Sequence, residues 1–127
     1  MQNQKTTKFQ YNVKRATHQL DATNQAVGRL ASTIAGLLMG KNRPDYSPHI
    51  DCGDQVEVIN SKLLKFTGKK LDQKEYIRHT GYPAGLRRKK MKEVFAQNPA
   101  EVIRQTVYKM LPKNKLRPIF IKRLKVK

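Results

Sequence analysis

The clearest hydrophobic pattern in this chain lies between residues 27 and 38. Apolar side chains recur there every three or four residues, which is the spacing of one face of an α-helix, and they are Val27, Leu30, Ala31, Ile34, Ala35, Leu37 and Leu38. Gly40 follows this face and predicts the end of the helix, because glycine readily adopts the left-handed backbone angles that terminate helices. Asn24 is the predicted N-cap.

Two short strands are predicted on either side of this helix. Residues 17–21 are predicted to form the first strand, followed by a turn over residues 22–25. Residues 55–60 are predicted to form the second, because three of them are β-branched and a Gly-Asp pair precedes them. The connection over residues 41–53 contains two prolines and is predicted to be irregular. A strand, a helix and a second strand in this order predict a right-handed crossover and a parallel pair.

The middle of the chain gives weaker signals. None of its segments has the length or the periodicity of the first helix. The predicted order is a short helical turn, a basic turn, a weak strand, a loop and a helix, at residues 61–66, 67–70, 76–78, 81–85 and 91–97.

The clearest capping signal follows directly. Asn98 is the predicted N-cap, Pro99 the first helical residue, and Glu101 stands three residues after the cap. The face that follows consists of Val102, Ile103, Thr106, Val107 and Met110. Pro112 is predicted to end this helix. The last segment repeats the helical spacing, with Pro118 in its first turn, at Leu116, Ile119, Phe120 and Leu124.

Together these elements predict one α/β domain with a small core. A chain of 127 residues buries about two thirds of its unfolded surface on folding, and nothing in the pattern requires a second domain. The apolar fraction is 38%, so we expect few residues in the core. The predicted core residues are Val27, Leu30, Ile34, Leu38, Val58, Val102, Ile103 and Val107.

Charge changes this picture more than any other property. The chain carries 27 Lys and Arg against 9 Asp and Glu, a formal net charge of +18. Solubility requires only about 2 to 8 units. Residues 1–20 and 102–127 contain no acid, and a third basic cluster lies at residues 87–92. We therefore predict a folded centre with basic projections that bind a polyanion, foremost nucleic acid, because neutralising phosphates releases condensed counterions.

Several classes of protein are disfavoured. Cys52 is the only cysteine, which excludes an intrachain disulfide and fits a reducing compartment. No run approaches the roughly 20 apolar residues of a membrane span, and the N-terminus lacks the apolar stretch of a secretory signal. We interpret the basic, serine-free N-terminus as a retained arm rather than an organellar transit peptide.

Catalytic and metal sites have weak support. His49, Asp51, Cys52 and Asp54 lie close together in the sequence, as metal ligands do. One imidazole and one thiol separated by two residues nevertheless fall short of the four-ligand spacing that structural zinc needs. Cys52 with His18 or His79 as a base lacks a nucleophile motif and an oxyanion hole. Residues 36–41 have three residues between their glycines, where a phosphate loop has four. The nine aromatic residues are spread along the chain, so no base-stacking platform is predicted.

Several ordered sequence blocks carry a resemblance to a known family. The blocks are Gly28 to Ser32 with Gly40 and Lys41; Tyr46, Ser47 and Pro48; Gly53 and Asp54 with Val56, Val58, Ile59 and Asn60; Thr67 to Lys70; Arg78 to Pro83; and Met110 to Asn114. In this order they resemble the bacterial-type large-subunit ribosomal protein thirteen, the universal L-thirteen family. The resemblance extends over about residues 17–126.

The resemblance implies a fold and a function. The fold it implies is a three-layer α/β/α core with a small, mainly parallel sheet. To this core the chain adds basic N- and C-terminal extensions, so we expect an N-terminal extension over residues 1–16 and an rRNA-binding domain with a basic C-terminal tail over residues 17–127. The function is that of a structural constituent of the large ribosomal subunit, not an enzyme. Such a protein binds and bridges large-subunit rRNA helices early in assembly. The expected partners are this rRNA and neighbouring ribosomal proteins, with no cofactor, metal, membrane or homo-oligomer.

The expected rRNA-binding residues come from several separate segments of the chain. They are Arg29, Lys41, Arg43, Lys69, Lys70, Arg78, His79, Arg87, Arg88, Lys89, Lys90, Lys113, Lys115 and Arg117. Their side chains are expected to replace diffuse counterions at fixed positions on the RNA.

The chain also departs from the family pattern. Lys109 stands where a glycine is usual, and Arg117 with Pro118 replaces a usual Gly-Arg pair. The sequence ends at Lys127, where family members continue into a tail, and residues 1–16 form an unusual extension expected to contact neighbouring rRNA or protein. The expected location is a ribosome in a bacterial cytoplasm, with an organellar ribosome as the alternative. A free regulatory RNA binder that represses its own message is a rival with the same composition.

Overall fold

A computed structural model describes residues 13–127 of the chain, so most of the predicted N-terminal extension, residues 1–12, lies outside the described residues. The first elements are β1 (Thr17–Asp21), α1 (Val27–Met39) and β2 (Gln55–Ile59). β1 and β2 pair in parallel with Leu20 opposite Val58. The predicted strand, helix and parallel strand are therefore confirmed.

The prediction for α1 is confirmed at its C-terminal end and wrong at its N-terminal end. Gly40 has φ 78° and its N–H donates to the carbonyls of Gly36 and Leu37 at 3.0 and 3.1 Å. These bonds satisfy carbonyls that the helix end would leave unpaired, and the predicted stop is confirmed. The predicted cap at Asn24 is wrong, because Asn24 has φ 55° in the turn before the helix. The residue preceding α1 is Ala26, which caps it with no side-chain hydrogen bond.

The second half of the chain adds a hairpin, four α-helices, one turn of 3-10 helix and a third strand of the sheet to this unit. Its elements are η1 (Ser61–Leu63), α2 (Lys70–Gln73), β3 (Glu75–His79), β4 (Leu86–Lys90), α3 (Met91–Gln97), α4 (Pro99–Met110), α5 (Arg117–Lys122) and β5 (Leu124–Val126). β3 and β4 pair antiparallel, with Glu75 opposite Lys90, and are called the hairpin below. The sequence did not predict β4, because four consecutive cations follow Leu86 and hide any alternation of apolar and polar positions.

Helix α4 begins at the predicted proline. Pro99 is its first residue, although Asn98 makes no side-chain capping bond. Val102, Ile103 and Val107 are buried as predicted. Met110, predicted on the same face, is 42% exposed, and its sulfur accepts a hydrogen bond from the Ser32 hydroxyl at 3.5 Å.

The C-terminal segment differs from the prediction of a basic projection with helical spacing up to Leu124. α5 ends at Lys122, and β5 forms the third parallel strand, with Leu124 opposite Val56. Phe120 and Leu124 are both buried. The segment folds onto the sheet because its few apolar side chains complete the core, while the cations between them stay at the surface.

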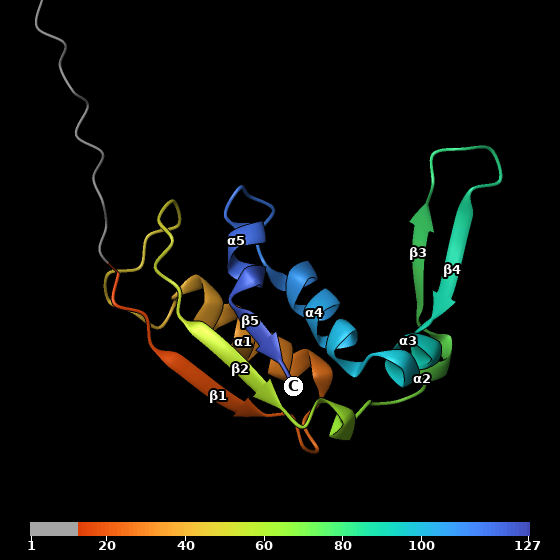
Figure 1. Cartoon of the computed structure of the whole chain (residues 1–127), viewed down its shortest axis with the longest axis horizontal. Helices are drawn as coiled ribbons and strands as arrows, with labels where there is room; N and C mark the ends of the chain where they lie inside the picture. Colours follow the sequence, from red (N-terminus) through yellow and green to blue (C-terminus); the bar gives the residue numbers. More distant parts are fainter. Residues whose placement is uncertain (1–12) are drawn as a thin grey trace, which may run out of the picture.

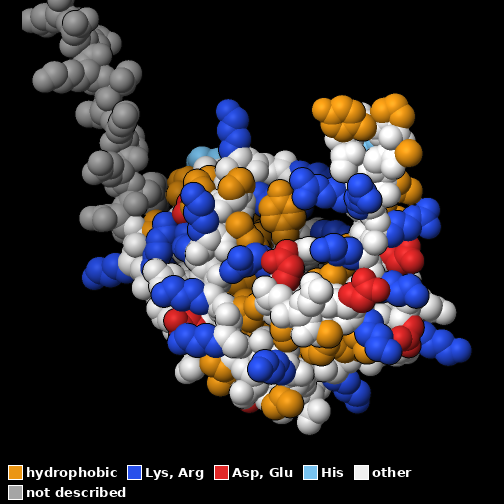
Figure 2. Space-filling model, turned by 45° about the vertical axis from the view of Figure 1, so that its right-hand side comes forward, with side chains coloured by type: hydrophobic (Ala, Val, Ile, Leu, Met, Phe, Trp, Pro, Cys, Tyr) orange, Lys and Arg blue, Asp and Glu red, His pale blue; other side chains and the backbone are white. Residues whose placement is uncertain are grey.

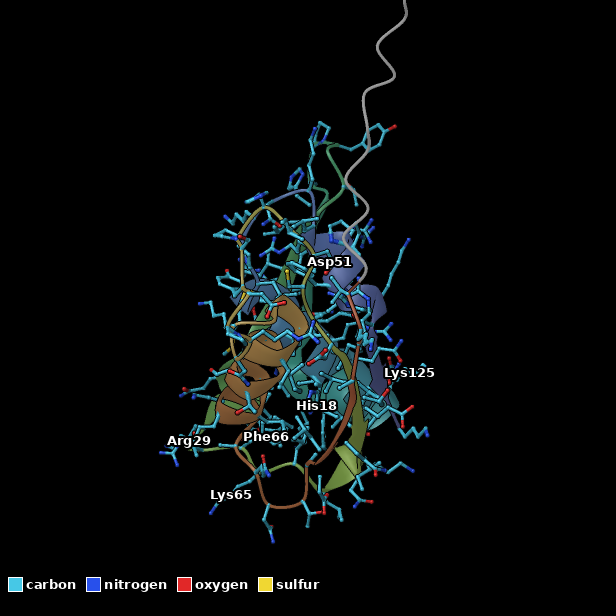
Figure 3. All side chains as sticks on the ribbon, turned by 90° about the vertical axis from the view of Figure 1, so that its left-hand side faces the viewer. His18, Arg29, Asp51, Lys65, Phe66 and Lys125 are labelled. Atoms are coloured by element: carbon cyan, nitrogen blue, oxygen red, sulfur yellow. The ribbon has the colours of Figure 1, made fainter. Side chains whose placement is uncertain are left out.

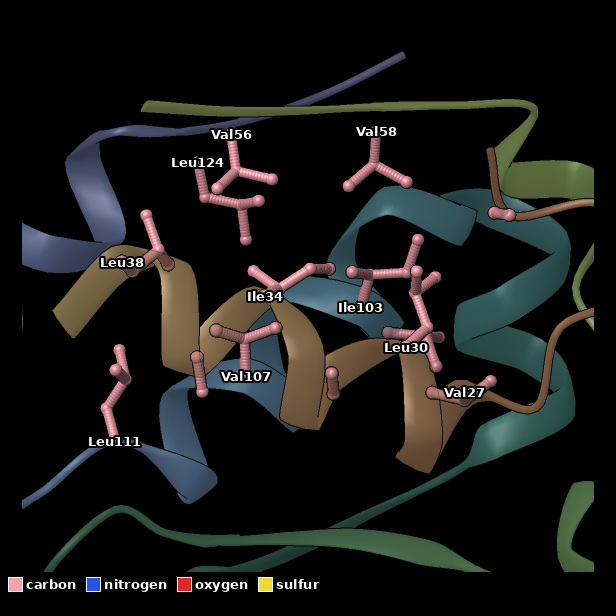
Figure 4. Packing of buried hydrophobic residues seen from close by; sticks show 14 of the residues in the cluster. Val27, Leu30, Ile34, Leu38, Val56, Val58, Ile103, Val107, Leu111 and Leu124 are labelled. Atoms are coloured by element: carbon pink, nitrogen blue, oxygen red, sulfur yellow. The ribbon is translucent and has the colours of Figure 1, made fainter. Parts of the chain in front are cut away.

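The core lies between the sheet and the helices. The sheet has the order β1-β2-β5, and Figure 4 shows Val56, Val58 and Leu124 pointing from it toward Ile34 of α1 and Ile103 of α4. All eight predicted core residues are buried. The α/β class with a small, mainly parallel sheet is confirmed.

The other face of the sheet is polar. Gln19 and Lys125 are exposed there, and Lys125 lies 3.9 Å from Glu57. Among residues 13–127, α1 and α4 therefore pack on one face only, and a second helical layer is not seen on the other. Figure 1 shows the hairpin rising at the far end of the molecule, away from the sheet. None of the helices described in residues 13–127 combines the length and apolar character needed to cross a membrane.

Candidate nucleic-acid interface

An open groove of about 1150 Å³ lies beside the N-terminal end of α1. Its other walls are residues 65–67, α2 and the C-terminal half of α4, and it is called the α1 groove below. The cations that line it are Arg29, Lys65, Lys70 and Lys74, and none of the described residues lining it is acidic. Figure 3 shows Arg29 and Lys65 at the same end of α1, with Lys125 on the opposite side of the molecule.

The start of α1 opens onto this groove. Ala26, Val27 and Gly28 line it, and the helix has neither a side-chain cap nor an acid in its first turn. The first backbone N–H groups of a helix have no partner within the helix, and they carry the positive end of its dipole. The backbone therefore adds to the positive potential that the four cations create.

Two ammonium groups lie against Tyr76 at the base of the hairpin, and the charge of Lys70 acts on one of them. Lys74 and Lys109 place their Nζ atoms 5.7 and 5.5 Å from the centre of the Tyr76 ring. Burial lowers the pKa of Lys74, and the charges of Lys109 and Lys70 lower it further. Burial, followed by the charge of Glu101, raises the pKa of Tyr76. Like charges held this close repel one another, and a bound anion would relieve that repulsion.

The hairpin carries cations on both faces. Because side chains alternate along a strand, Tyr76, Arg78, Arg87 and Lys89 lie on one face, and Ile77, His79, Leu86, Arg88 and Lys90 lie on the other. The first face is turned toward α4, because Lys109 of that helix contacts the Tyr76 ring. Figure 2 shows Lys and Arg side chains on both sides of the hollow that separates the hairpin from the rest of the molecule.

Two of the predicted binding residues make mainly internal contacts. The Arg43 guanidinium donates to the carbonyls of Cys52 and Lys14 and lies 3.9 Å from Asp54. Arg117 donates to the Leu111 carbonyl at 2.9 Å, and its guanidinium lies 4.1 Å from the centre of the Tyr108 ring. These two side chains hold loops in place.

The other predicted cations are mostly free of carboxylates. Arg88 is 3.9 Å from Glu75, and this pair is exposed. Within residues 13–127, no ion pair involves the remaining predicted residues, which are Arg29, Lys41, Lys69, Lys70, Arg78, His79, Arg87, Lys89, Lys90, Lys113 and Lys115. All eleven are exposed.

The structure brings these residues together only in part. Arg29 and Lys70 share the α1 groove, whereas Lys113 and Lys115 lie in the loop between α4 and α5, and Lys41 follows the end of α1. Sequence reasoning missed three cations that the fold adds to the groove and the hairpin base, Lys65, Lys74 and Lys109. Two signals in the sequence single out Lys109: it lies in the acid-free C-terminal stretch, and it stands where the family pattern predicts a glycine.

In the body of the protein, by which we mean the sheet β1-β2-β5 with α1, α4, α5 and the loops that join them, several cations are paired with acids. Arg123 contacts both oxygens of Asp51 at 2.6 and 2.8 Å and donates to the Leu38 carbonyl at 2.9 Å. Arg15 lies 3.1 Å from Asp51, and His18 lies 3.0 Å from Asp54. Burial would raise the pKa of Asp54, but hydrogen bonds from His18 and the Ala16 N–H, with the charge of Arg43, lower it below its usual value.

Asp51 and Asp54, the two acids of the possible metal site in the sequence, both take part in these ion pairs. Within the described part of the chain, no three His, Cys, Asp or Glu side chains are grouped as a metal site would require. Cys52 is buried, and its sulfur lies 3.8 Å from the Asp45 carbonyl oxygen. The hydrogen bonds of His18 and His79 go to Asp54 and to the Gly81 N–H.

Fold and surface together define a small, basic α/β protein whose unpaired cations gather on a groove, a hairpin and connecting loops. Residues 15–126 match the family model described as ribosomal protein L13, and the chain belongs to this family. A relative from Aquifex aeolicus, named large ribosomal subunit protein uL13, is 49% identical over 114 residues, covering 90% of this chain and 79% of the relative. Proteins of the same name from Thermobifida fusca and Thermosipho africanus are 48% and 46% identical, covering 90% and 97% of this chain and 76% and 83% of their own lengths.

Proposed function

We propose that this protein is a structural constituent of the large ribosomal subunit that binds large-subunit rRNA by neutralising its phosphates. The observation that carries the proposal is the contrast between paired and unpaired cations. Arg15 and Arg123 meet carboxylates in the body, whereas the cations of the α1 groove make no ion pair within residues 13–127. Unpaired cations crowded together destabilise a protein alone and bind phosphate favourably. The relatives named large ribosomal subunit protein uL13 support the same role.

The position of the two cationic surfaces supports bridging of separate rRNA segments. The α1 groove lies beside the core, and the hairpin projects from the molecule at its far end. A rigid body that offers cations on two surfaces holds two phosphate backbones together although they repel one another. Such bridging would act early in subunit assembly, with neighbouring ribosomal proteins as further partners.

The rival is a free RNA binder that regulates its own message. It would carry the same cations, but it would not be present in one copy per large subunit. Quantitative mass spectrometry of purified large subunits separates the two functions. We expect one copy per subunit, and absence from the subunit would favour the regulator.

The salt dependence of rRNA binding tests phosphate neutralisation directly. If about 6 to 10 phosphates are contacted, affinity for the large-subunit rRNA transcript of the same organism falls about 10³- to 10⁵-fold between roughly 50 and 200 mM salt. Filter binding over this range measures the slope. An affinity that does not change with salt would contradict the proposal.

Two double variants test which surface of the protein contacts the rRNA. Arg87 and Lys89 face α4 from β4, whereas Lys125 and Lys127 lie near Glu57. Replacing Arg87 and Lys89 by Ala is expected to weaken rRNA binding and to reduce the salt slope by about 1.4 to 1.8. Replacing Lys125 and Lys127 by Ala removes the same charge, and we expect the slope to stay near that of the wild type. Equal losses in the two variants would show that net charge, not position, determines binding.

A further inference from the structure

The tip of the hairpin combines an exposed aromatic ring with a closely held turn. Tyr82 is 76% exposed, more than the other large hydrophobic side chains in the described chain. It belongs to residues 80–85, which join β3 to β4. Figure 2 shows hydrophobic side chains gathered at this tip, with Lys and Arg along the strands below it. A ring this exposed adds nothing to the core, so its place at the tip needs another explanation.

Hydrogen bonds fix the turn that presents the ring. The Gly85 N–H donates to the Tyr82 carbonyl at 2.9 Å, and the Thr80 N–H donates to the Gly85 carbonyl at 3.0 Å. The Gly81 N–H donates to Nδ1 of His79 at 2.9 Å. Three successive contacts therefore close the tip on itself, and the ring is presented by a shaped turn.

Two backbone positions show that the turn is constrained. Ala84 has φ 58°, a left-handed angle that is unfavourable for a residue with a Cβ atom. Gly85 is buried although it lies in a projecting tip, and a Cβ atom there would stand 2.0 Å from Oγ1 of Thr80. Unfavourable backbone angles persist where the surrounding contacts impose them, and they cluster at binding sites. This turn keeps such an angle while holding Tyr82 in solvent.

The surroundings of the ring favour RNA over an apolar protein surface. The hairpin carries five Lys and Arg against one acid, Glu75. On its outer face, Ile77 stands opposite Arg88, so that an apolar and a cationic side chain face each other. An apolar protein surface would desolvate these cations without compensation. RNA offers both a phosphate for the cation and a base for the apolar side chain.

We propose that Tyr82 stacks on an unpaired base of the large-subunit rRNA, with phosphates of the same strand held by Arg78 and Arg87, which face each other across the two strands and are the Lys and Arg residues nearest the tip. The inference rests on the proposed function and names what the hairpin tip recognises. The base must be unpaired, in a loop or a bulge, because a base inside a duplex already has a neighbour on each face. A single projecting ring at the end of the hairpin reaches one such base, which differs from a sheet surface that stacks several.

Matched variants of the full chain test the stacking. Tyr82→Leu keeps an apolar side chain and removes the ring, and Tyr82→Phe keeps the ring and removes the hydroxyl. With the large-subunit rRNA transcript of the same organism as the probe, we expect Tyr82→Leu to bind about 5- to 150-fold more weakly, which corresponds to losing one stacked base. Tyr82→Phe is expected to bind as the wild type does. Both variants should keep the thermal midpoint of the wild type, because the Tyr82 side chain is exposed and lies outside the core.

The salt slope separates stacking from phosphate contact. Tyr82→Leu should keep the wild-type slope, whereas Arg87→Gln should reduce it by about 0.7 to 0.9. Wild-type affinity for Tyr82→Leu would overturn the inference, as would an equal loss in Tyr82→Phe, which would assign the effect to the hydroxyl. A Tyr82→Leu defect in subunit incorporation with normal rRNA affinity would assign the tip to a protein neighbour. In all three cases the proposed function stands, because other observations would overturn it: rRNA binding by the wild type that does not depend on salt, or absence of the protein from the large subunit.

Discussion

The hairpin and the body of the protein use the same kinds of residue in opposite ways. In the body, Ile34 is fully buried and Arg123 makes a close ion pair with Asp51. In the hairpin, Ile77 is 62% exposed, and Arg88 lies no closer than 3.9 Å to its one acidic neighbour. Isoleucine and arginine thus stabilise the body, and they remain available on the hairpin.

This contrast separates what folds the chain from what we propose to bind RNA. A two-stranded hairpin is marginally stable in water by itself, and this one is attached to the body only at its base. There the Met91 N–H donates to the Lys74 carbonyl at 2.8 Å, and the rings of Phe66 and Phe95 pack edge to face at 4.9 Å. The base is therefore held by the fold, and substitutions in the projecting part should change binding without changing stability.

The same substitution in the two regions gives the largest expected difference. Ile34→Ala removes buried methyl groups between the sheet and α4, and we expect it to lower the free energy of unfolding by about 2 to 5 kcal/mol. Ile77→Ala removes the same atoms from an exposed position and should stay within about 0.5 kcal/mol of the wild type. Urea unfolding followed by circular dichroism measures both. A loss of similar size in Ile77→Ala would show that the hairpin is part of the cooperative core.

Arg123 in the body and Arg88 in the hairpin give a second comparison, with an expected effect of intermediate size. Arg123 is 11% exposed at its side chain and bonds Asp51 and the Leu38 carbonyl. Arg123→Met leaves the Leu38 carbonyl unpaired and leaves Asp51 with Arg15 as its remaining partner, so we expect a loss of about 1 to 3 kcal/mol. Arg88→Met, at 60% exposure, should leave the unfolding free energy within about 0.5 kcal/mol of the wild type and should weaken rRNA binding. Chemical unfolding and filter binding on the same preparations test both halves, and a stability loss in Arg88→Met would contradict the division.

The sequence predicted the body better than the hairpin for a physical reason. In the body, burial imposes a period on the apolar residues, so that α1, β2 and the core positions such as Leu30 and Val107 follow from the pattern. Of the strand residues in the hairpin, Tyr76 alone is partly buried and the others are exposed, so β4 shows no period to detect. β5 was missed because three residues are too few to distinguish a strand from the end of a helix.

Some residues of the candidate site could be predicted from the sequence, and others could not. Charge runs identified Arg87 and its neighbours, because a cluster of cations is visible in the sequence itself. Lys65 and Lys74 are isolated in the sequence, and only the fold brings them to the same groove as Arg29. Sequence reasoning also grouped Arg43 with the binding residues, although its guanidinium makes internal bonds that depend on the position of residues 14 and 52.

Acid unfolding gives the smallest expected difference between the regions. The pKa of Asp54 lies below its ordinary value of 3.8, because the hydrogen bonds from His18 and Ala16 and the charge of Arg43 outweigh the opposing effect of burial. A carboxyl group with a lower pKa in the folded than in the unfolded state stabilises the fold above the unfolded value. That contribution disappears as the pH falls through the folded value.

We therefore expect Asp54→Asn to lose less stability than the wild type when the pH is lowered from about 5 to about 2.5. Glu75→Gln is the matched change on the hairpin, where the carboxylate is 3.9 Å from Arg88 in an exposed pair, and it should keep the wild-type loss. Hydrogen bonds from the Thr23 backbone and side chain and from Asn60 also lower the pKa of Asp21. Part of the acid sensitivity therefore remains in the wild type and in both variants. Urea unfolding at the two pH values measures the difference. An undiminished acid loss in Asp54→Asn would mean that the paired charges of the body do not set its stability, and the contrast with the hairpin would then rest on apolar burial alone.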